Sequence, residues 1–391
     1  MSERYYPRLL RAPRQSFFLL GPRGTGKSTW VRKEFPDTHR IDLLDEALYQ
    51  SYLARISLFA DELRALPVGS TVCVDEVQRI PPLLNEVHRF IEERRLRFIL
   101  CGSSARKLKQ QGTNLLAGRA VRRELHPFVP AELGGAFDLE AALSHGSLPV
   151  IWQAPSRSDA LSAYVQLYLK EEIQAEALVR NLPGFARFLP LAALFHGQTL
   201  NVATLARDAE AARTSVIGYL DILEDTLLAF RLPAYAARMR VREKRHPKLY
   251  WIDAGIVRAL KRQLSTPTSE ERGVLFEGWI ANLLRIYRDY RDLFDDWYYW
   301  APAEAARTEV DFLLKKGARW LAIEAKSATS VGDDALRGLR AIHGLKGLVR
   351  RIVVHPGSRR LVTRDGIEIW PVSHFLRALD EESLWQPLDV T

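Results

Sequence analysis

Cysteine and long apolar runs are both scarce in this chain of 391 residues. The two cysteines, Cys73 and Cys101, are too few for a disulfide framework or a zinc cluster. Both stand within apolar, strand-like runs, so we expect small core residues of a protein in a reducing compartment. No stretch approaches the roughly 20 uninterrupted apolar residues of a membrane helix, and residues 1–14 are polar and basic, unlike a secretory signal. The sequence therefore predicts a cytoplasmic protein with no membrane partner.

Internal repeats and low-complexity tracts are also absent, and the length allows two or three hydrophobic cores. Lysine and arginine number 56 against 47 aspartates and glutamates, which gives a formal charge of +9. The basic excess is diluted by many acids, yet it favours nucleic acid as a partner.

The first chemical motif follows the apolar run 17–20, which reads as a buried strand. Residues 21–28 read GPRGTGKS, a complete G-x-x-x-x-G-K-S phosphate-binding loop. Its glycines let backbone N–H groups point into one nest for phosphate oxygens, Lys27 adds a positive charge, and the Ser28 hydroxyl can bind Mg²⁺. The sequence therefore predicts a site for a nucleoside triphosphate. The predicted nucleotide-binding residues are Gly21, Pro22, Arg23, Gly24, Thr25, Gly26, Lys27, Ser28 and Thr29.

Two further strand ends supply polar groups to the same site. The run 71–76 ends in Asp75, which would hold Mg²⁺ through its water shell, and Glu76, which would polarise the attacking water. The run 97–101 ends beside Ser103 and Ser104. Either serine can sense the γ-phosphate, or a serine there can cap the next helix. The predicted catalytic residues here are Glu76, Ser103 and Ser104.

Changes of pattern along the chain predict four parts. Residues 1–130 alternate short apolar runs with helical patterns, which indicates a parallel sheet wrapped by helices. Residues 131–185 read as helices, either a lid over the nucleotide or a plain spacer. Residues 186–262 fit a winged helix-turn-helix, whose Arg207, Arg213 and basic run 238–246 would follow a phosphate backbone or form a solvated face. Residues 263–391 begin with an amphipathic helix at 273–290 and an aromatic strand at 297–300.

A second constellation lies in this last part. A turn at 315–317 joins two strands, so Asp311 should lie near Glu324, with Glu324 and Lys326 on one face. Glu277, on the preceding helix, is a candidate third carboxylate. Such a group suits phosphodiester hydrolysis, because acids bind Mg²⁺ or Mn²⁺ and the lysine stabilises negative charge. The alternative is an exposed, salt-bridged hairpin.

Taken together, these motifs resemble a family of bacterial and archaeal AAA+ ATPases. In this family a P-loop domain is joined to a winged helix and a PD-(D/E)xK restriction-endonuclease-like domain. The matching stretches are the Walker A motif 21–28, the Walker B motif 75–76, the sensor 1 position 102–104, the arginine-finger position 118–119, and the nuclease-fold motifs 276–277, 309–311 and 324–326, with a further recurrent stretch at 248–255. The chain departs from the family at 146–149, which reads Gly-Ser-Leu-Pro, and at Lys170-Glu171, so the resemblance does not extend to lid-mediated sensing.

The resemblance implies an α/β multidomain fold and a homo-oligomeric ring, commonly a hexamer, with ATP at each subunit boundary. Arg119 would enter the neighbour's site and neutralise transition-state charge on the γ-phosphate. The first expected function is an ATP-driven DNA-binding motor or remodeller acting on duplex or branched DNA. The second is an ATP-regulated nuclease that cuts with Asp311, Glu324 and Lys326, against which stands a nuclease-like fold used only for binding. The third is a nucleotide-switched regulatory scaffold that binds a protein partner.

Overall fold

The computed structural model describes residues 4–104, 116, 118–168, 182–235, 246–302 and 308–386. The pair Lys170-Glu171 and the basic run up to residue 245 lie outside the described residues. None of the described helices combines the length and the apolar composition needed to span a membrane.

The first part of the chain is a five-stranded parallel sheet in the order β2-β3-β4-β1-β5. Its strands are β1 (Ser16–Leu20), β2 (His39–Asp42), β3 (Thr71–Asp75), β4 (Arg97–Gly102) and β5 (Ala120–Glu124). The strands predicted from the apolar runs 17–20, 71–76 and 97–101 are present, and β2 adds an edge strand that the sequence reasoning missed. Because β4 lies between β1 and β3, the carboxyl ends of all three meet at one edge of the sheet.

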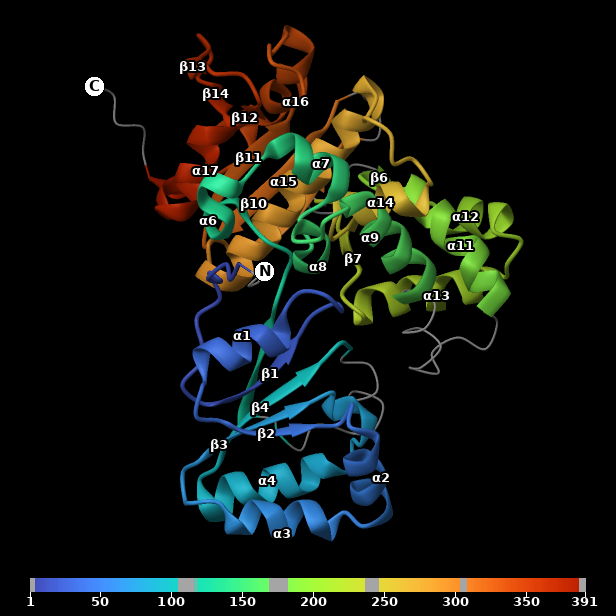
Figure 1. Ribbon diagram of the computed structural model, residues 1–391. Coiled ribbons are helices and arrows are strands. Elements are labelled where there is room, and N and C mark those ends of the chain that lie inside the picture. The colour runs from blue at the N-terminus through green and yellow to red at the C-terminus, as the bar shows by residue number, and fades with distance from the viewer. Residues whose placement is uncertain are drawn as a thin grey trace.

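Helices cover both faces of this sheet, as Figure 1 shows. The helices are α1 (Lys27–Glu34), α2 (Glu46–Ala54), α3 (Ser57–Ala65) and α4 (Leu83–Arg94), with the short turn η1 (Val77–Arg79) after β3. Successive side chains of β1 point to opposite faces of the sheet. Phe17 packs with Trp30 of α1, whereas Phe18 contacts the core under α3 and α4. Strands that are buried on both faces are expected in a parallel sheet of this kind.

A group of short helices follows the sheet: α6 (Pro130–Leu133), α7 (Leu139–His145), α8 (Pro149–Trp152) and α9 (Arg157–Ala163), with the 3-10 turn η3 (Gly134–Ala136) after α6 and the π-helical turn η4 (Tyr164–Tyr168) after α9. These helices confirm the helical character expected for this region within the described residues. They pack mainly on the C-terminal half of the chain, where α7 lies against α14 and α15 and α9 lies against α14 (Figure 1).

The next part contains three helices and a small antiparallel sheet, followed by a fourth helix. The order along the chain is α11 (Leu182–Leu194), β6 (Gln198–Thr199), α12 (Val202–Asp208), α13 (Arg213–Asp225), β7 (Ala229–Leu232), β8 (Lys248–Trp251) and α14 (Ala254–Leu260). The sheet order is β6-β8-β7. Asn201 caps α12 by accepting from the N–H groups of Ala203 and Thr204, which explains why that helix begins there. Helix α11 runs across the boundary expected at residue 185.

The last part packs the long helix α15 (Ser269–Arg291) on a six-stranded mixed sheet in the order β13-β14-β12-β11-β10-β9. The strands are β9 (Asp296–Trp300), β10 (Val310–Lys316), β11 (Arg319–Ala325), β12 (Leu348–His355), β13 (Leu361–Val362) and β14 (Glu368–Pro371). Helix α17 (Val372–Asp380) and the turn η7 (Ser383–Trp385) join α15 on one face. The other face packs on η5 (Asp333–Leu336), α16 (Arg337–Ala341) and η6 (Ile342–Gly344). The predicted helix, aromatic strand and hairpin are all confirmed.

Candidate functional site

The phosphate-binding loop joins β1 to α1 and depends on glycine at two positions. Gly24 and Gly26 have φ of 82° and 86°, in the left-handed region that side chains with a Cβ rarely adopt. The ammonium of Lys27 is buried and donates to the carbonyl oxygens of Gly21 at 2.7 Å and Pro22 at 3.3 Å. The loop therefore holds its cation at the place where the motif predicts phosphate contact.

The Walker A and Walker B motifs touch directly. The hydroxyl of Ser28, at the start of α1, donates to Oδ2 of Asp75, at the end of β3, over 2.6 Å. A hydroxyl and a carboxylate oxygen are ligands that Mg²⁺ prefers in proteins, so the donor set at this point fits that ion.

Glu76 is held by a glutamine that the sequence reasoning missed. Gln78, in η1 and only 3% exposed, donates its side-chain N–H groups to the Glu76 carboxylate and to the Ser103 hydroxyl, the latter over 3.2 Å. A Cβ on Gly102 would lie 2.4 Å from Oε1 of Gln78, so the glycine makes room for the amide. The only sequence signal was a polar residue two positions after Glu76.

Ser103 and Ser104 lie buried at the end of β4, between the Walker A and Walker B strand ends. Ser103 thus occupies the position from which a γ-phosphate could be sensed. The residues after Ser104 lie outside the described residues, so the helix-cap alternative for this serine stays open.

A cavity of about 220 Å³ opens beside the loop and the first turns of α1. Aromatic rings of Tyr5, Tyr6 and Phe128 line it together with Thr25 and Thr29. Such a mixture of flat apolar rings and a few polar groups suits a planar ring system. The sequence analysis described residues 1–14 only as a polar and basic segment. The adjacent tyrosines Tyr5 and Tyr6 were the signal that this segment lines a cavity.

The short helices after the sheet contact the phosphate-binding loop. The N–H of Val150 donates to the carbonyl of Gly24 at 3.2 Å, and the Tyr164 hydroxyl donates to the carbonyl of Arg23 at 3.0 Å. These contacts place the predicted lid against the predicted nucleotide site.

The atypical turn 146–149 binds another part of the chain. The N–H of Ser147 donates to Oδ2 of Asp253 at 2.6 Å, and a Cβ on Gly146 would collide with the same carboxylate. Asp253 also caps α14. The recurrent stretch 248–255 thus ties the short helices to the C-terminal half.

Arg119 lies at the far edge of the sheet from its own phosphate-binding loop. It precedes β5, whose start pairs with the start of β1, so roughly 16 Å of strand separates it from the loop. Its guanidinium forms an ion pair with Glu92 of α4, and its side chain is 39% exposed.

The second predicted constellation is assembled as expected. Asp311 on β10 and Glu324 on β11 are adjacent, and Asp311 accepts from the N–H of Ala325 at 3.0 Å. Lys326 donates to Glu324 at 2.6 Å, and Glu277 of α15 closes the group. Asp311 and Glu324 are 2% and 5% exposed, so the alternative of an exposed hairpin is wrong.

Two residues of β8 enter this cluster; both lie in the recurrent stretch 248–255, but neither was assigned to the cluster from the sequence. The Lys248 ammonium lies 2.8 Å from Oε1 of Glu277, 3.4 Å from Oδ1 of Asp311 and 3.5 Å from Oε1 of Glu309. The Tyr250 hydroxyl donates to Glu277 at 2.6 Å. Burial, helped by the Asp311 charge, raises the pKa of Glu277 to about 7 against the opposing effect of Lys248. The signal was a lysine and a tyrosine two positions apart, on one face of a strand.

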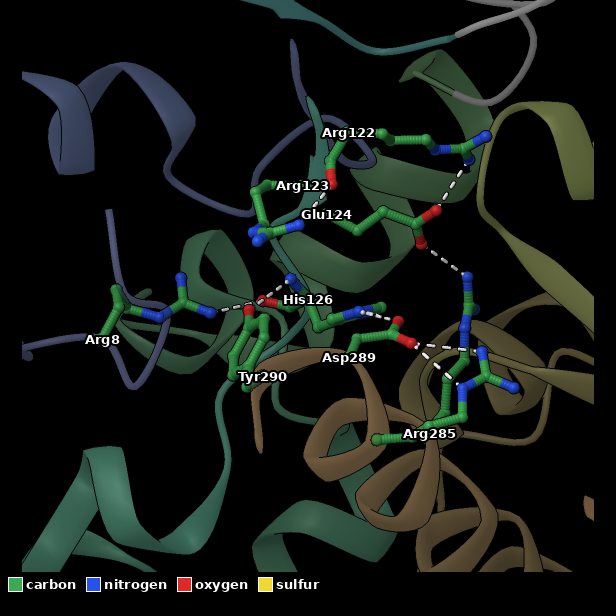
Figure 2. Close-up of polar contacts among 9 residues, drawn as sticks. Arg8, Arg122, Arg123, Glu124, His126, Arg285, Asp289 and Tyr290 are labelled. Atoms are coloured by element: carbon green, nitrogen blue, oxygen red, sulfur yellow. Dashed lines mark hydrogen bonds and ion pairs between the residues drawn. The ribbon is translucent and has the colours of Figure 1, made fainter. Parts of the chain in front are cut away.

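A third group of charged residues joins the sheet domain to α15 (Figure 2). Ligand atoms of Glu124, His126 and Asp289 lie within 4.8 Å of one another, a spacing that can suit a metal. These groups already have partners within the protein. Glu124 forms ion pairs with Arg285 at 2.8 Å and with Arg122 at 2.6 Å. His126 contacts Asp289 at 2.9 Å. Burial alone would raise the pKa of Asp289, but the contact with His126 and nearby Arg285 lower it. The group is an ion-pair network between domains.

The same interface reaches the phosphate-binding loop. The N–H of His126 donates to the Tyr290 hydroxyl of α15 at 3.1 Å. Arg8 donates to the carbonyls of His126 and Thr25, the latter over 2.8 Å, and pairs with Glu132 at 3.0 Å (Figure 2 shows Arg8, His126 and Tyr290 together). One arginine therefore links the loop to the segment that holds α15.

Three family models match successive parts of the chain. Residues 13–134 match an AAA domain, residues 136–268 a domain of unknown function (DUF8612), and residues 272–375 a second domain of unknown function (DUF4143). Two uncharacterized proteins, from Mycobacterium bovis and Mycobacterium tuberculosis, are each 26% identical over 378 residues, which is 94% of this chain and 82% of the relative.

Two solved structures show weak similarity. The ORC1 protein of Aeropyrum pernix in complex with DNA matches 65% of this chain and 87% of its own, with 12% identity and a TM-score of 0.26. A Vibrio cholerae protein matches 94% of this chain and 96% of its own, with 14% identity and a TM-score of 0.21. With its phosphate-binding loop and its five-stranded parallel sheet, the segment 13–134 is thus similar to P-loop ATPase domains of the AAA type.

Proposed function

We propose that this protein hydrolyses ATP at a boundary between subunits and uses the cycle to move or remodel duplex or branched DNA. The observation that carries the proposal is the 2.6 Å contact between Ser28 and Asp75, which joins the two motifs that a Mg²⁺-bound triphosphate requires. Glu76, Gln78 and Ser103 continue the site beyond this contact.

Each part of ATP has a matching group in this arrangement. The loop N–H groups and Lys27 contact the phosphates, and the cavity beside Tyr5 and Tyr6 takes the base. Ser28 and Asp75 hold Mg²⁺, which neutralises charge on the β- and γ-phosphates when bound. Glu76 then orients the attacking water, and Gln78 fixes the direction of that carboxylate.

The proposed oligomer follows from the place of Arg119. Because its guanidinium lies at the opposite edge of the sheet from its own loop, it reaches a γ-phosphate only on another subunit. A homo-oligomeric ring, which we take to be a hexamer, supplies such a neighbour at every site. Arg119 exchanges Glu92 for the phosphate when the ring forms.

DNA binding is proposed for the part with three helices and the small sheet. The order α11-β6-α12-α13-β7-β8 is that of a winged helix-turn-helix, in which the later helix enters the major groove. Arg207 and Arg213 are exposed at α12 and at the start of α13. The formal charge of +9 favours a polyanionic partner over the alternative of a protein partner.

A second candidate function is metal-dependent cleavage of DNA by the C-terminal part. The succession α15-β9-β10-β11-α16-β12 and the cluster of Asp311, Glu324 and Lys326 favour a PD-(D/E)xK-like fold. Lys248 stands among the carboxylates that a metal would need, so the donor set does not fit that ion as it is arranged. We therefore assign this domain to DNA binding rather than to cleavage.

Replacement of the loop lysine tests the proposal. Lys27→Ala should abolish ATP binding and turnover, because the β- and γ-phosphates lose their cation. Arg32→Ala, an exposed change on the same helix, should leave both unchanged. The assay is the ATPase rate with single-stranded, duplex, forked and four-way DNA, with cleavage products examined on the same samples.

The result has three separable outcomes. A rate in wild type that rises with duplex or branched DNA supports the proposal, and a Lys27→Ala protein that still turns over ATP refutes the site. The nucleotide-switched scaffold is favoured instead if no DNA changes the wild-type ATPase rate and if binding of a protein partner does not depend on salt.

A further inference from the structure

We propose that Lys248 is a built-in counter-ion of the C-terminal carboxylate cluster, and that it keeps a divalent metal ion out while β8 stays in place. The Lys248 ammonium lies within 3.5 Å of carboxylate oxygens from Glu277, Asp311 and Glu309. These acids come from α15, from β10 and from the residue before β10. The inference does not depend on the ATP site, which has its own residues.

The oxygens that a metal would need are already used. A Mg²⁺ or Mn²⁺ ion requires several oxygens at about 2.0–2.2 Å, converging on one point. Here the ammonium occupies the convergence point, Tyr250 donates to Glu277, the N–H of Ala325 donates to Asp311, and Lys326 donates to Glu324. A second cation at this point would meet the Lys248 charge in a poorly solvated space.

The balance of charge points the same way. Four carboxyl groups, those of Glu277, Glu309, Asp311 and Glu324, face two ammonium groups. Lys248 is 3% exposed, whereas the Lys326 side chain is 37% exposed and stands at the open side. Removal of Lys248 therefore leaves a deep group of acids without its central cation, and a divalent ion of the same sign can replace it.

Lys248 is fixed by the small sheet and not by a flexible loop. It pairs with Thr199 of β6 on one side and with Leu232 of β7 on the other. Its ammonium also lies 5.6 Å from the ring centroid of Tyr299. Movement of the small sheet would withdraw the ammonium, which couples metal entry to the position of the proposed DNA-binding part.

The test is binding of Mn²⁺, followed by electron paramagnetic resonance on full-length protein without nucleotide. Every protein carries Asp75→Asn, so that the loop site contributes no ion. The parent should show no tight Mn²⁺ site, and Lys248→Met should gain one site per chain with at least tenfold tighter binding. The matched control, Lys326→Met, should gain none, because Lys248 is still in place. Adding Asp311→Asn to Lys248→Met should remove the new site.

Two results would overturn the inference. One is stoichiometric Mn²⁺ binding by the parent that Asp311→Asn removes and Lys248→Met leaves unaltered. The other is a Lys248→Met protein with the parent's circular dichroism and no Mn²⁺ site. Should that variant not fold, Lys248→Gln keeps a hydrogen-bond donor without the charge and is judged by the same two results. ATPase activity, measured separately, reports on the proposed function and not on this cluster.

Discussion

Gln78 shows how a single side chain can connect the parts of the proposed ATPase centre. Its amide donates both to the carboxylate that would orient water and to the serine at the end of β4. Glu76 has φ of 55°, in the left-handed region that residues other than glycine rarely adopt. The buried amide of Gln78 is a contact that holds the carboxylate of this residue.

Gln78→Met should therefore slow turnover while leaving nucleotide affinity nearly unchanged. The substitution keeps the length of the side chain but removes both hydrogen bonds, worth about 1–3 kcal/mol, which corresponds to roughly 5- to 150-fold in kcat. Steady-state ATPase rates and nucleotide dissociation constants measure the two effects separately. Gln50→Met, at an exposed position of α2, is the matched control and should change neither. Equal kcat in the two variants would contradict the role given to Gln78.

The elements that carry the motifs were predictable because their signals are local. Each of β1, β3 and β4 is a short apolar run followed at once by the residue that matters. The alternation along β10 and β11 likewise placed Asp311 beside Glu324. Strand β2 was missed because only Ile41 of its four residues is buried, too little for a periodic pattern.

Other side chains could not be assigned to a site from the sequence, because their contacts are with residues far away along the chain. Lys248 meets Asp311 from 63 positions away, and Arg8 meets His126 from 118. The lysine and the tyrosine on one face of β8 are a local signal, but the local pattern does not show which acids they contact. The same holds for the tyrosine pair that lines the cavity.

At the scale of elements, α12 and α13 should supply contacts to DNA phosphates. Replacing both Arg207 and Arg213 with alanine should weaken binding similarly for all sequences and reduce the slope of log affinity against log salt by up to about 2, one for each lost phosphate contact. Fluorescence anisotropy from low to moderate salt measures this slope. Arg55→Ala, an exposed change between α2 and α3 of the parallel-sheet part, should leave it unaltered. An unchanged slope in the double variant would place the DNA elsewhere.

At the scale of the whole molecule, α15 enters the carboxylate cluster and is linked to the phosphate-binding loop through other residues. Glu277 lies in its first half, in the carboxylate cluster, while Arg285, Asp289 and Tyr290 lie in its second half, in the network with the sheet domain (Figure 2). Arg8 extends this network to the phosphate-binding loop. A single rigid helix thus provides a physical link between the ATPase domain and the C-terminal domain.

The order of parts along the chain followed from the sequence, but their mutual packing did not. Composition and periodicity separate the parallel sheet from the helical and mixed parts that follow. They do not specify that Glu124 and Asp289, 165 positions apart, share one network, since each looks like an ordinary surface acid. A carboxylate requires a guanidinium partner only when it is buried, and the local sequence does not show that these two acids are buried.

The central claim is that one subunit completes the reaction centre of the next, and mixing two inactive variants tests it most directly. Arg119→Ala lacks the guanidinium, and Glu76→Gln lacks the carboxylate that orients water. Each alone should bind ATP with little turnover. In a 1:1 mixture, about a quarter of random interfaces join an intact Glu76 to an intact Arg119, so ATPase activity should return to that order of the wild-type rate. A mixture as inactive as its components, in assemblies shown to exchange subunits, would contradict the account.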